Sequence, residues 1–475
     1  MSNNKIVVVI LGTTGVGKTK LSIELSKKYN GEVINADALQ VYKGLDIITN
    51  KATEEERQNI PHHLFNFIEP TEEYSVTEFV EDAIKKIDDI HNRNKIPIII
   101  GGTHYYIQSL LFNNSLMSNT ITDIIVTPED KKIQDENLKL IKNLFEKTPS
   151  CTKEEIYELL KKVDPVTAKS RHPNDERRNR RSLEIYLNNK IPQSKIIENQ
   201  KIYGKKQSFR YRTCCFWLYS EQNILNQRLD DRVDTMIEKG LFDEIKEMKK
   251  YYDQLKKDHN QDNLYTRGIF QAIGFKEFDA YLKLLNENKS NNDDGDGDGG
   301  SDEEKAKKLN ELKNSSIEKM KNATKRYSRK QISWIKNKFL PRFSEEDSID
   351  PNQARLYILD ISDVSQWNEA VTKVSNTVLD NFIKGLETLN PREINSIAKE
   401  IYYEIEMPID INSKDTAQIR KRQHSNQWEK YECDVCINSE KGPRILNGLV
   451  EWERHKKSRT HRMNVKKQKR AKEKE

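Results

Sequence analysis

The residues of this chain that point most directly to chemistry are eight near its start, Gly12-Thr13-Thr14-Gly15-Val16-Gly17-Lys18-Thr19. They follow a short apolar run and precede a segment with helical spacing, which is the setting of a P-loop. The backbone N–H groups of such a turn converge on an anion, Lys18 adds a point charge, and the Thr19 hydroxyl can bind the Mg²⁺ that accompanies a phosphate chain. We therefore predict that residues 12–19 bind a diphosphate or a triphosphate. The motif alone does not say which.

A second group of residues, near the end of the sequence, has the spacing of a metal site. Its members follow the pattern C-x2-C-x18-H-x5-H and are Cys433, Cys436, His455 and His461. Two cysteines on a tight turn and two histidines on one helix would close a tetrahedral zinc shell, as structural zinc requires. So short a module would take its folding energy from the metal, with Leu446, Leu449 and Trp452 as its small core. The spacing resembles matrin-like zinc fingers associated with RNA, and the lysines and arginines around it suit phosphate backbones.

The third candidate is Asp37, which follows a short apolar run at 32–35. Parallel sheets place their sites at the carboxyl ends of strands, where a carboxylate can accept a proton or hold a metal. A P-loop NTPase usually ends a later strand in an Asp that helps to hold Mg²⁺. Here the apolar run 96–100 ends in Gly101-Gly102-Thr103 instead. This difference argues against routine nucleotide hydrolysis.

Buried strands and amphipathic helices must position these residues. The sequence predicts strands at 7–11, 32–35, 96–100 and 213–219 and a helix at 76–93. Continuous apolar strands separated by helices indicate an α/β fold whose parallel sheet is covered on both faces. We further expect a helical insertion, a strand at 355–361, a helix at 371–386 and a separate small zinc-finger module.

These elements predict the following domains. They are a P-loop core at 1–118 and 209–345, a helical insertion at 119–208, a linker and accessory segment at 346–425, a zinc finger at 426–463 and a basic tail at 464–475. Residues 286–308 have almost no apolar side chains and are predicted to be a disordered insertion within the core.

Composition limits the class of protein. The chain has 475 residues, 35% of them hydrophobic, with 81 basic against 75 acidic side chains, and its mean hydropathy is −0.87. Net charge is therefore a weak argument for nucleic acid, and local clusters must carry it. Five cysteines, two of them adjacent, favour a reducing compartment over a disulfide framework. No apolar run is long enough to span a bilayer. Because nothing before the first strand could serve as a presequence, we expect a cytosolic protein. Nucleus and mitochondrion stay open, and we expect a monomer.

Seven further blocks of sequence fall in a characteristic order. They lie at 35–47, 60–64, 101–106, 172–184, 229–241, 271–277 and 324–334. Together with the P-loop they resemble the tRNA dimethylallyltransferases, also called tRNA isopentenyltransferases. The resemblance runs from residue 6 to about residue 340, and the appended finger is similar to that of the eukaryotic branch.

The resemblance implies a reaction and a role for each catalytic residue. The P-loop would hold the diphosphate of dimethylallyl diphosphate, whose prenyl group moves to N6 of the adenosine just 3′ of the tRNA anticodon. Asp37 would be the general base and Thr103 would help to orient the adenine or the departing oxygen. Lys18, Arg232 and Mg²⁺ on Thr19 would neutralise the leaving diphosphate. Such a reaction needs little more than charge stabilisation and alignment of a poor nucleophile.

The resemblance also implies the tRNA contacts. The flipped base would be gripped by Asp37, Ala38, Leu39, Gln40 and Thr103. The anticodon stem–loop would meet a helix capped by Asn174 or Asp175, through Arg177, Arg178, Arg180 and Arg181. The alternative for these arginines is a solvated helix face. The basic cluster 325–330 is expected to bind backbone phosphates without reading a base.

Two positions depart from the family pattern, and three other functions stay open. Ala38 stands where the family often has Ser, and Ile48 where it usually has Gly, which puts the local loop conformation in question. A small-molecule kinase would use the P-loop for ATP but leaves the zinc module without a purpose. An adenylate isopentenyltransferase would not need the arginine-bearing insertion. An RNA-binding scaffold with a decayed core would not need intact Lys18, Asp37 and Arg232.

Overall fold

The computed structural model of this chain describes residues 5–113, 128–146, 151–202, 208–259, 265, 267–285, 302–406, 430–438 and 442–472. The chain forms two compact units, one of 1–116 with 207–407 and one of 117–206 with 408–475. The first unit holds the P-loop and is called the core unit below. The predicted fold class is confirmed, because a parallel sheet, a helical insertion and a small Cys/His module are all present. Within the described residues, no helix is both long and apolar enough to cross a membrane.

The core unit is built on one six-stranded sheet with the order β3-β2-β4-β1-β5-β6. All the strand pairs are parallel. The strands are β1 (Ile6–Gly12), β2 (Gly31–Asn35), β3 (His62–His63), β4 (Ile96–Ile100), β5 (Arg212–Tyr219) and β6 (Ala354–Asp360). β1 lies between β4 and β5, where Val9 is paired with Ile99 on one side and with Cys215 on the other. The P-loop that follows β1 is therefore central at the carboxyl edge of the sheet.

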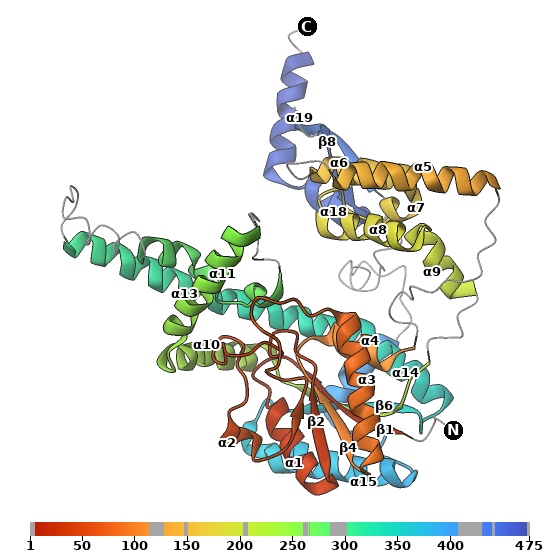
Figure 1. Cartoon of the computed structure of the whole chain (residues 1–475), viewed down its shortest axis with the longest axis vertical. Helices are drawn as coiled ribbons and strands as arrows, with labels where there is room; N and C mark the ends of the chain where they lie inside the picture. Colours follow the sequence, from red (N-terminus) through yellow and green to blue (C-terminus); the bar gives the residue numbers. More distant parts are fainter. Residues whose placement is uncertain are drawn as a thin grey trace. The chain divides into compact units, whose positions relative to one another are not determined.

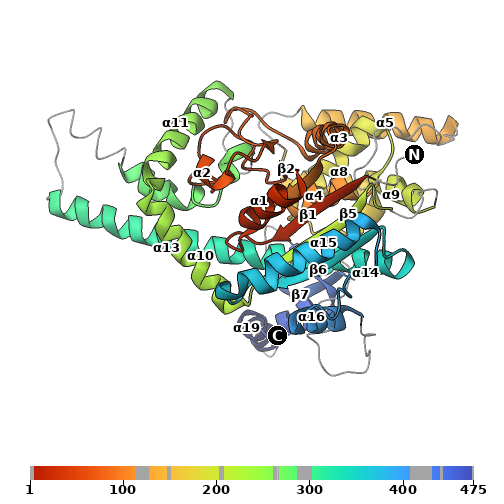
Figure 2. The ribbon, with the colours of Figure 1, turned by 90° about the horizontal axis from the view of Figure 1, so that it is seen from below.

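Helices cover both faces of this sheet (Figure 1, Figure 2). Val7 and Val9 of β1 point into one hydrophobic layer, and Val8 and Ile10 point into the other, because side chains alternate along a strand. The first layer is closed by α3 (Val76–Asn92), α4 (His104–Leu111), α14 (Leu340–Ile349) and α16 (Ser396–Glu406). The second is closed by α1 (Lys18–Tyr29) and α15 (Val374–Lys384). Burial on both faces explains why these strands read as continuous apolar runs.

A helical part of the core unit has its own hydrophobic core beneath the loop that follows β2. It contains α10 (Gln222–Glu238), α11 (Leu241–His259), η2 (Gly268–Gln271), η3 (Lys276–Phe278) and α13 (Asp302–Trp334). The short helix α2 (Glu54–Arg57) is not part of this hydrophobic core. Because α13 begins at Asp302, the prediction of disorder is wrong for 302–308, where Glu, Lys and Ala have high helix propensity. Residues 286–301 lie outside the described residues.

The segment 346–407 belongs to the core unit, whereas the sequence pattern places a linker and accessory segment there. It supplies β6, η5 (Val364–Gln366), η6 (Asn368–Lys373), α15 and α16. β6 pairs with β5 over seven residues, so this segment completes the sheet. The predicted strand at 355–361 and helix at 371–386 correspond to β6 and to η6 with α15. The pattern identified the elements but not the sheet that they join.

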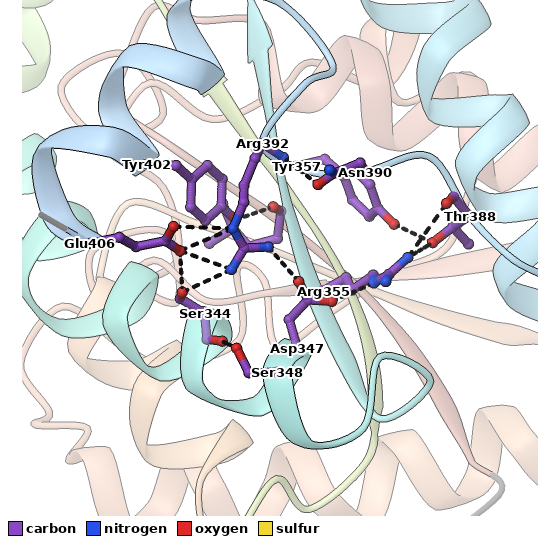
Figure 3. A network of polar contacts seen from close by, with 11 residues as sticks. Ser344, Asp347, Ser348, Arg355, Tyr357, Thr388, Asn390, Arg392, Tyr402 and Glu406 are labelled. Carbon is purple, nitrogen blue, oxygen red and sulfur yellow. Dashed lines mark hydrogen bonds and ion pairs between the residues drawn. The ribbon is translucent and has the colours of Figure 1, made fainter.

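A polar network fastens the end of this segment to α14 and β6, as Figure 3 shows. Asp347 accepts hydrogen bonds from Arg355 Nε at 2.5 Å and from Arg392 Nη1 at 2.7 Å. Arg392 also pairs with Glu406 of α16 at 2.8 Å. Asp347 is 10% exposed, so its charge is compensated by two guanidinium groups rather than by water. The network holds α16 against the sheet after a turn through 385–395.

The insertion is helical, as the sequence predicts. Its helices are α5 (Pro128–Phe145), α6 (Lys153–Val163), α7 (Pro165–Lys169), α8 (Glu176–Asn189) and α9 (Gln193–Ile202). Ile141, Ile156, Leu160 and Leu183 form the centre of a small apolar core. A capping box of Thr152 with Glu155 begins α6.

The C-terminal module consists of a hairpin and two helices. They are β7 (Lys430–Asn438), β8 (Gly442–Asn447), α18 (Gly448–Lys456) and α19 (Arg459–Lys472). His455 lies at the end of α18 and His461 at the start of α19, so the prediction of one helix for both histidines is wrong. Ser458 interrupts the helix, and its hydroxyl accepts the His461 N–H at 3.2 Å as a cap of α19.

Candidate active site

The P-loop joins β1 to α1 through residues 13–17. Gly15 and Gly17 have φ values of 80° and 82°, a conformation that side chains with a Cβ seldom adopt. The Gly17 carbonyl accepts the Leu21 N–H at 3.1 Å and so begins the hydrogen bonding of α1. Val16 is buried against α1 and anchors the turn. The loop thus presents its backbone at the amino end of a helix, as anion binding requires.

Two cations at this loop, Lys18 and Arg232, are partly buried and make no direct ion pair among the described residues. Burial lowers the pKa of Lys18 to about 8; Asp37 acts in the opposite sense and Arg232 adds to the lowering. Burial also lowers the pKa of Arg232, on α10, to about 10, against the pull of Glu56 and Asp37. Neither cation has an ion-pair partner within the described part of the chain. Two partly desolvated cations without a direct ion pair are typical of a site that takes an anion.

Lys18 keeps one internal contact, a hydrogen bond from its Nζ to the Thr13 carbonyl at 2.6 Å. Thr13 is 2% exposed, and its Oγ1 has no hydrogen-bond partner. Thr14 and Thr19 are partly buried beside it. A loop that carries three threonine hydroxyls and a lysine has the polar groups that a phosphate chain with its metal would need.

Asp37 lies just beyond β2 and faces the same two cations, since it acts on the pKa of both. One oxygen, Oδ1, accepts the Leu39 N–H at 3.0 Å. The other, Oδ2, points toward Gly102, where an added Cβ would lie only 3.0 Å away. Thr103 Oγ1 accepts the Ala38 N–H at 2.9 Å, so the ends of β2 and β4 are joined beside the carboxylate. The structure therefore brings Asp37, Thr103, Lys18 and Arg232 together.

Two residues of α13, Tyr327 and Gln331, complete this side of the site, although their residue types alone do not predict a role there. Gln331, which is 4% exposed, donates from Nε2 to the Gly102 carbonyl at 2.9 Å. The Tyr327 hydroxyl donates to the same carbonyl at 3.3 Å, and burial together with nearby Asp37 raises the pKa of this phenol. Both residues lie in the block 324–334, but only the lysines and arginines of that block predicted a function from the sequence.

Part of the basic cluster 325–330 on α13 forms ion pairs inside the protein. Lys325 pairs with Asp230 of α10 at 2.8 Å, and the neighbouring Lys321 pairs with Asp234 at 2.7 Å. These pairs flank Arg232 on α10 and tie that helix to α13. Lys325 is therefore engaged by a carboxylate instead of standing free for a phosphate.

His104, the first residue of α4, is a further neighbour that the sequence did not single out. It is 4% exposed. Burial lowers the pKa of its imidazole to about 3, and the charge of Lys18 adds to the effect. The imidazole is thus neutral at physiological pH and adds no third positive charge beside the P-loop.

The four arginines of α8 differ in their surroundings. Asp175 caps the helix by accepting the Arg178 N–H, as predicted. Arg177, Arg178 and Arg181 are exposed. Arg180 is half-buried, with its guanidinium 5.2 Å from the Phe145 ring centre and 3.2 Å from Cys151 Sγ. Three of the four are thus accessible to a polyanion, and Arg180 helps to hold the insertion together.

The Cys/His module gathers four side chains that could hold a zinc ion. One ligand atom from each of Cys433, Cys436, His455 and His461 lies within 4.8 Å of all the others. His461 Nδ1 is 3.4 Å from Cys433 Sγ and 3.2 Å from His455 Nε2. Ligands of a tetrahedral zinc ion are separated by about 3.3–3.8 Å, so the four groups fit that ion. The Trp452 and Tyr431 rings stack with their centres 5.7 Å apart, and Leu446 of β8 is buried. The Leu449 side chain lies outside the described residues.

Comparison with known proteins decides the family. The model described as IPP transferase matches residues 40–338, and the isopentenyl transferase model matches residues 5–65. This chain belongs to the tRNA dimethylallyltransferase family. It is a prenyl transferase, and the Saccharomyces cerevisiae tRNA dimethylallyltransferase is 35% identical over 98% of this chain and 93% of the relative. The Schizosaccharomyces pombe relative is 34% identical over 97% and 95%, and the human one 34% identical over 98% and 86%.

A solved structure agrees with this assignment. A crystal structure of a eukaryotic dimethylallyltransferase acting on tRNA matches with a TM-score of 0.73 at 33% identity. The match covers 99% of this chain and 98% of that one. The resemblance seen in the sequence is therefore confirmed, including its eukaryotic type.

The departure from the family pattern at Ile48 is accommodated by the loop that follows β2. Ile48 is 6% exposed and has a negative φ, so the missing glycine causes no backbone strain. Gln40 Nε2 donates to the carbonyls of Thr49 and Asn50 at 3.1 and 3.0 Å. The buried Lys51 ammonium donates to the Tyr42 carbonyl at 2.5 Å and to Asp46 at 2.8 Å. The loop is thus fixed from within, and Gln40 is one of its internal contacts.

Proposed function

We propose that this transferase moves the dimethylallyl group from dimethylallyl diphosphate to N6 of the adenosine 3′-adjacent to the tRNA anticodon. Diphosphate is the second product. The observation that carries the proposal is the pair of partly buried cations, Lys18 and Arg232, which make no direct ion pair within the described residues and so can take an anionic counter-charge in addition to nearby Asp37. A diphosphate supplies that counter-charge, and its departure from an allylic carbon needs it.

In this proposal the P-loop stabilises the leaving group. The backbone of residues 12–17 and the Lys18 ammonium take one side of the diphosphate, and Arg232 takes the other. A Mg²⁺ on the Thr19 hydroxyl would complete its ligands with diphosphate oxygens and water, as this ion prefers, and would supply additional charge neutralisation. The low local dielectric that lowers the pKa of both cations makes each contact stronger than it would be in water.

Asp37 acts as the general base in this scheme. It removes a proton from N6 as the C–N bond forms, and the pair Asp37–Leu39 N–H keeps the carboxylate oriented. Thr103 fixes the turn that carries the carboxylate and orients the adenine. Ala38, Leu39 and Gln40 form the wall against which the flipped base rests, and the base must leave its stack because N6 is otherwise enclosed.

The exposed arginines of α8 are proposed to bind the anticodon stem–loop through its phosphates. Arg177, Arg178 and Arg181 present their charge to solvent on one helix of the insertion. Phosphate contacts of this kind place the tRNA without reading its sequence. The zinc module, with its basic α19, is proposed as a second tRNA contact.

The test is nucleoside mass spectrometry on unmodified tRNA incubated with the protein, Mg²⁺ and dimethylallyl diphosphate, with AMP and ATP as competing acceptors. We expect a mass gain of one prenyl group on an adenosine of the anticodon loop. The Asp37→Asn variant should turn over more slowly by about 10²- to 10⁴-fold, the range for one general base. Prenylated AMP with untouched tRNA would overturn the proposed acceptor, and wild-type turnover by Asp37→Asn would overturn the proposed base.

A further inference from the structure

Trp367 packs against the P-loop from a part of the chain far from it. It lies between η5 and η6, beyond residue 338, where the family match ends. The residue is 8% exposed and belongs to the hydrophobic layer of α1. A Cβ added to Gly17 would lie 2.8 Å from two carbons of the indole ring. The ring therefore occupies the space that a side chain at position 17 would need.

The indole is held in that position by α1 itself. Its Nε1–H donates to Glu24 Oε1 at 3.0 Å, and the Thr372 hydroxyl donates to Glu24 Oε2 at 2.8 Å. The Lys20 ammonium lies 4.4 Å from the centre of the ring, within the range of a cation–π contact. Polar and aromatic contacts thus bind the ring to the first two turns of α1, directly after the phosphate-binding loop.

We propose that Trp367 is a positioning residue of the donor site, which fixes Gly17 and the N-terminus of α1 for binding of the diphosphate. The proposal rests on the proposed function, because the diphosphate is the ligand whose site is being positioned. Gly17 has the left-handed backbone conformation and no side chain with which to hold it. The neighbouring ring supplies the missing restraint.

Preorganisation is the reason that this restraint matters for binding. A P-loop binds through backbone N–H groups, so its affinity depends on how well their directions are fixed before the anion arrives. Trp367 acts through Gly17 and α1, so its removal should weaken diphosphate binding without a direct contact being lost. Acceptor binding depends on other residues and should change little.

The experiment compares Trp367→Ala, Trp367→Phe and a control, Phe382→Ala. Phe382 is 1% exposed in the same hydrophobic layer, on α15, and is not among the atoms nearest to a Cβ built on Gly17. Binding of inorganic diphosphate with Mg²⁺ is measured by calorimetry, tRNA binding by filter retention and stability by thermal unfolding. We expect Trp367→Ala to weaken diphosphate binding about tenfold, or 1.4 kcal/mol. Trp367→Phe should recover most of this loss, and the tRNA Kd of both should stay within about twofold.

The control separates positioning from general destabilisation. Phe382→Ala should lower the Tm at least as much as Trp367→Ala and leave the diphosphate Kd unchanged. An equal loss of diphosphate binding in Phe382→Ala, or none in Trp367→Ala, would overturn the inference. If Trp367→Ala does not fold, Glu24→Gln, which loosens the indole contact, should still weaken binding about two- to threefold; an unchanged Kd there would overturn the inference equally. Failure of the wild-type protein to bind diphosphate would instead overturn the proposed function.

Discussion

Arg232 of α10 and the arginines of α8 are the same residue type in opposite settings. Burial lowers the pKa of Arg232 to about 10, and no carboxylate among the described residues pairs with it. On α8, Arg178 and Arg181 are exposed, and each lies near a carboxylate of its own helix, Asp175 at 3.6 Å and Glu184 at 3.1 Å. Exposed ion pairs of this kind contribute little to stability, so these side chains exchange partners readily.

The difference teaches how one charge can serve two purposes. A desolvated cation acts strongly over a short range on one defined anion, which suits the stabilisation of charge that develops in a reaction. An exposed cation is screened by salt and acts on any nearby phosphate, which suits recruitment of a polyanion. The core unit should therefore control the chemical step, and the insertion should control tRNA affinity.

The sharpest test of this comparison makes the same Arg→Gln substitution on α10 and on α8. We expect Arg232→Gln to reduce kcat by about 10²- to 10³-fold, the usual cost of one group that stabilises developing charge. Its tRNA Kd should not change. Arg178→Gln is the matched variant, and it should alter the Kd while sparing kcat. A loss of tRNA binding in Arg232→Gln would break the comparison.

The second test is the pH dependence of donor binding. Diphosphate favours the protonated form of Lys18, whose pKa in the free protein is about 8. As pH rises above this value the lysine loses its proton, so the KM for the donor should increase by up to about tenfold per pH unit. The KM for tRNA is the internal control, because exposed arginines keep their charge throughout this range. A donor KM that is flat from pH 7 to 9 would contradict the desolvation of Lys18.

The zinc module provides a smaller expected effect. Cys433→Ser removes one of four ligands, and the module should lose its metal and its fold. If its basic surface binds phosphates, the tRNA Kd should rise about three- to tenfold at low salt and less at high salt. Single-turnover rates with saturating tRNA should stay at the wild-type value. Zinc content by atomic absorption confirms the loss of metal, and equal Kd values at every salt concentration would exclude the module from tRNA binding.

The smallest effect is expected for a single exposed arginine. Arg177→Ala should weaken tRNA binding about two- to threefold and reduce the slope of log K against log salt by about 1. Arg180→Ala is its counterpart, since Arg180 packs on Phe145 inside the insertion. That variant should lower thermal stability and leave the salt slope unchanged. A change of salt slope in Arg180→Ala together with a loss of thermal stability in Arg177→Ala would mean that the roles of the two arginines are the opposite of those assigned.

The core strands were predictable because a strand that is buried on both faces appears in the sequence as a continuous apolar run. The predicted strand 96–100 coincides with β4, and the predictions for β1 and β5 differ from the observed bounds by at most one residue at either end. The strand near 355 was also recognisable. Its membership of the sheet was not, because an apolar run shows that a strand is buried but not which strand it pairs with. That pairing depends on contacts with β5, more than a hundred residues earlier.

The same limit applies to the site. The P-loop and Asp37 follow their strands directly, so local sequence places them. Gln331 reaches the site only because α13 crosses the end of β4, and Trp367 only because β6 completes the sheet; no local pattern contains either fact. In the C-terminal module the spacing identified the four Cys and His side chains that lie together, but the helix break at Ser458 depended on a cap that spacing alone does not show.

The central position of β1 has a consequence for how the protein is made. β1 ends at Gly12, while its neighbour β5 begins at Arg212, so about 200 residues must be synthesised before that edge is paired. At a rate of about 5–20 residues per second, the most apolar strand of the nascent chain has an open edge for about 10–40 s. Unpaired strand edges of this kind invite association between chains. The order of strands that places the P-loop at the centre of the sheet therefore leaves the newly synthesised chain with an edge open to association until β5 has emerged.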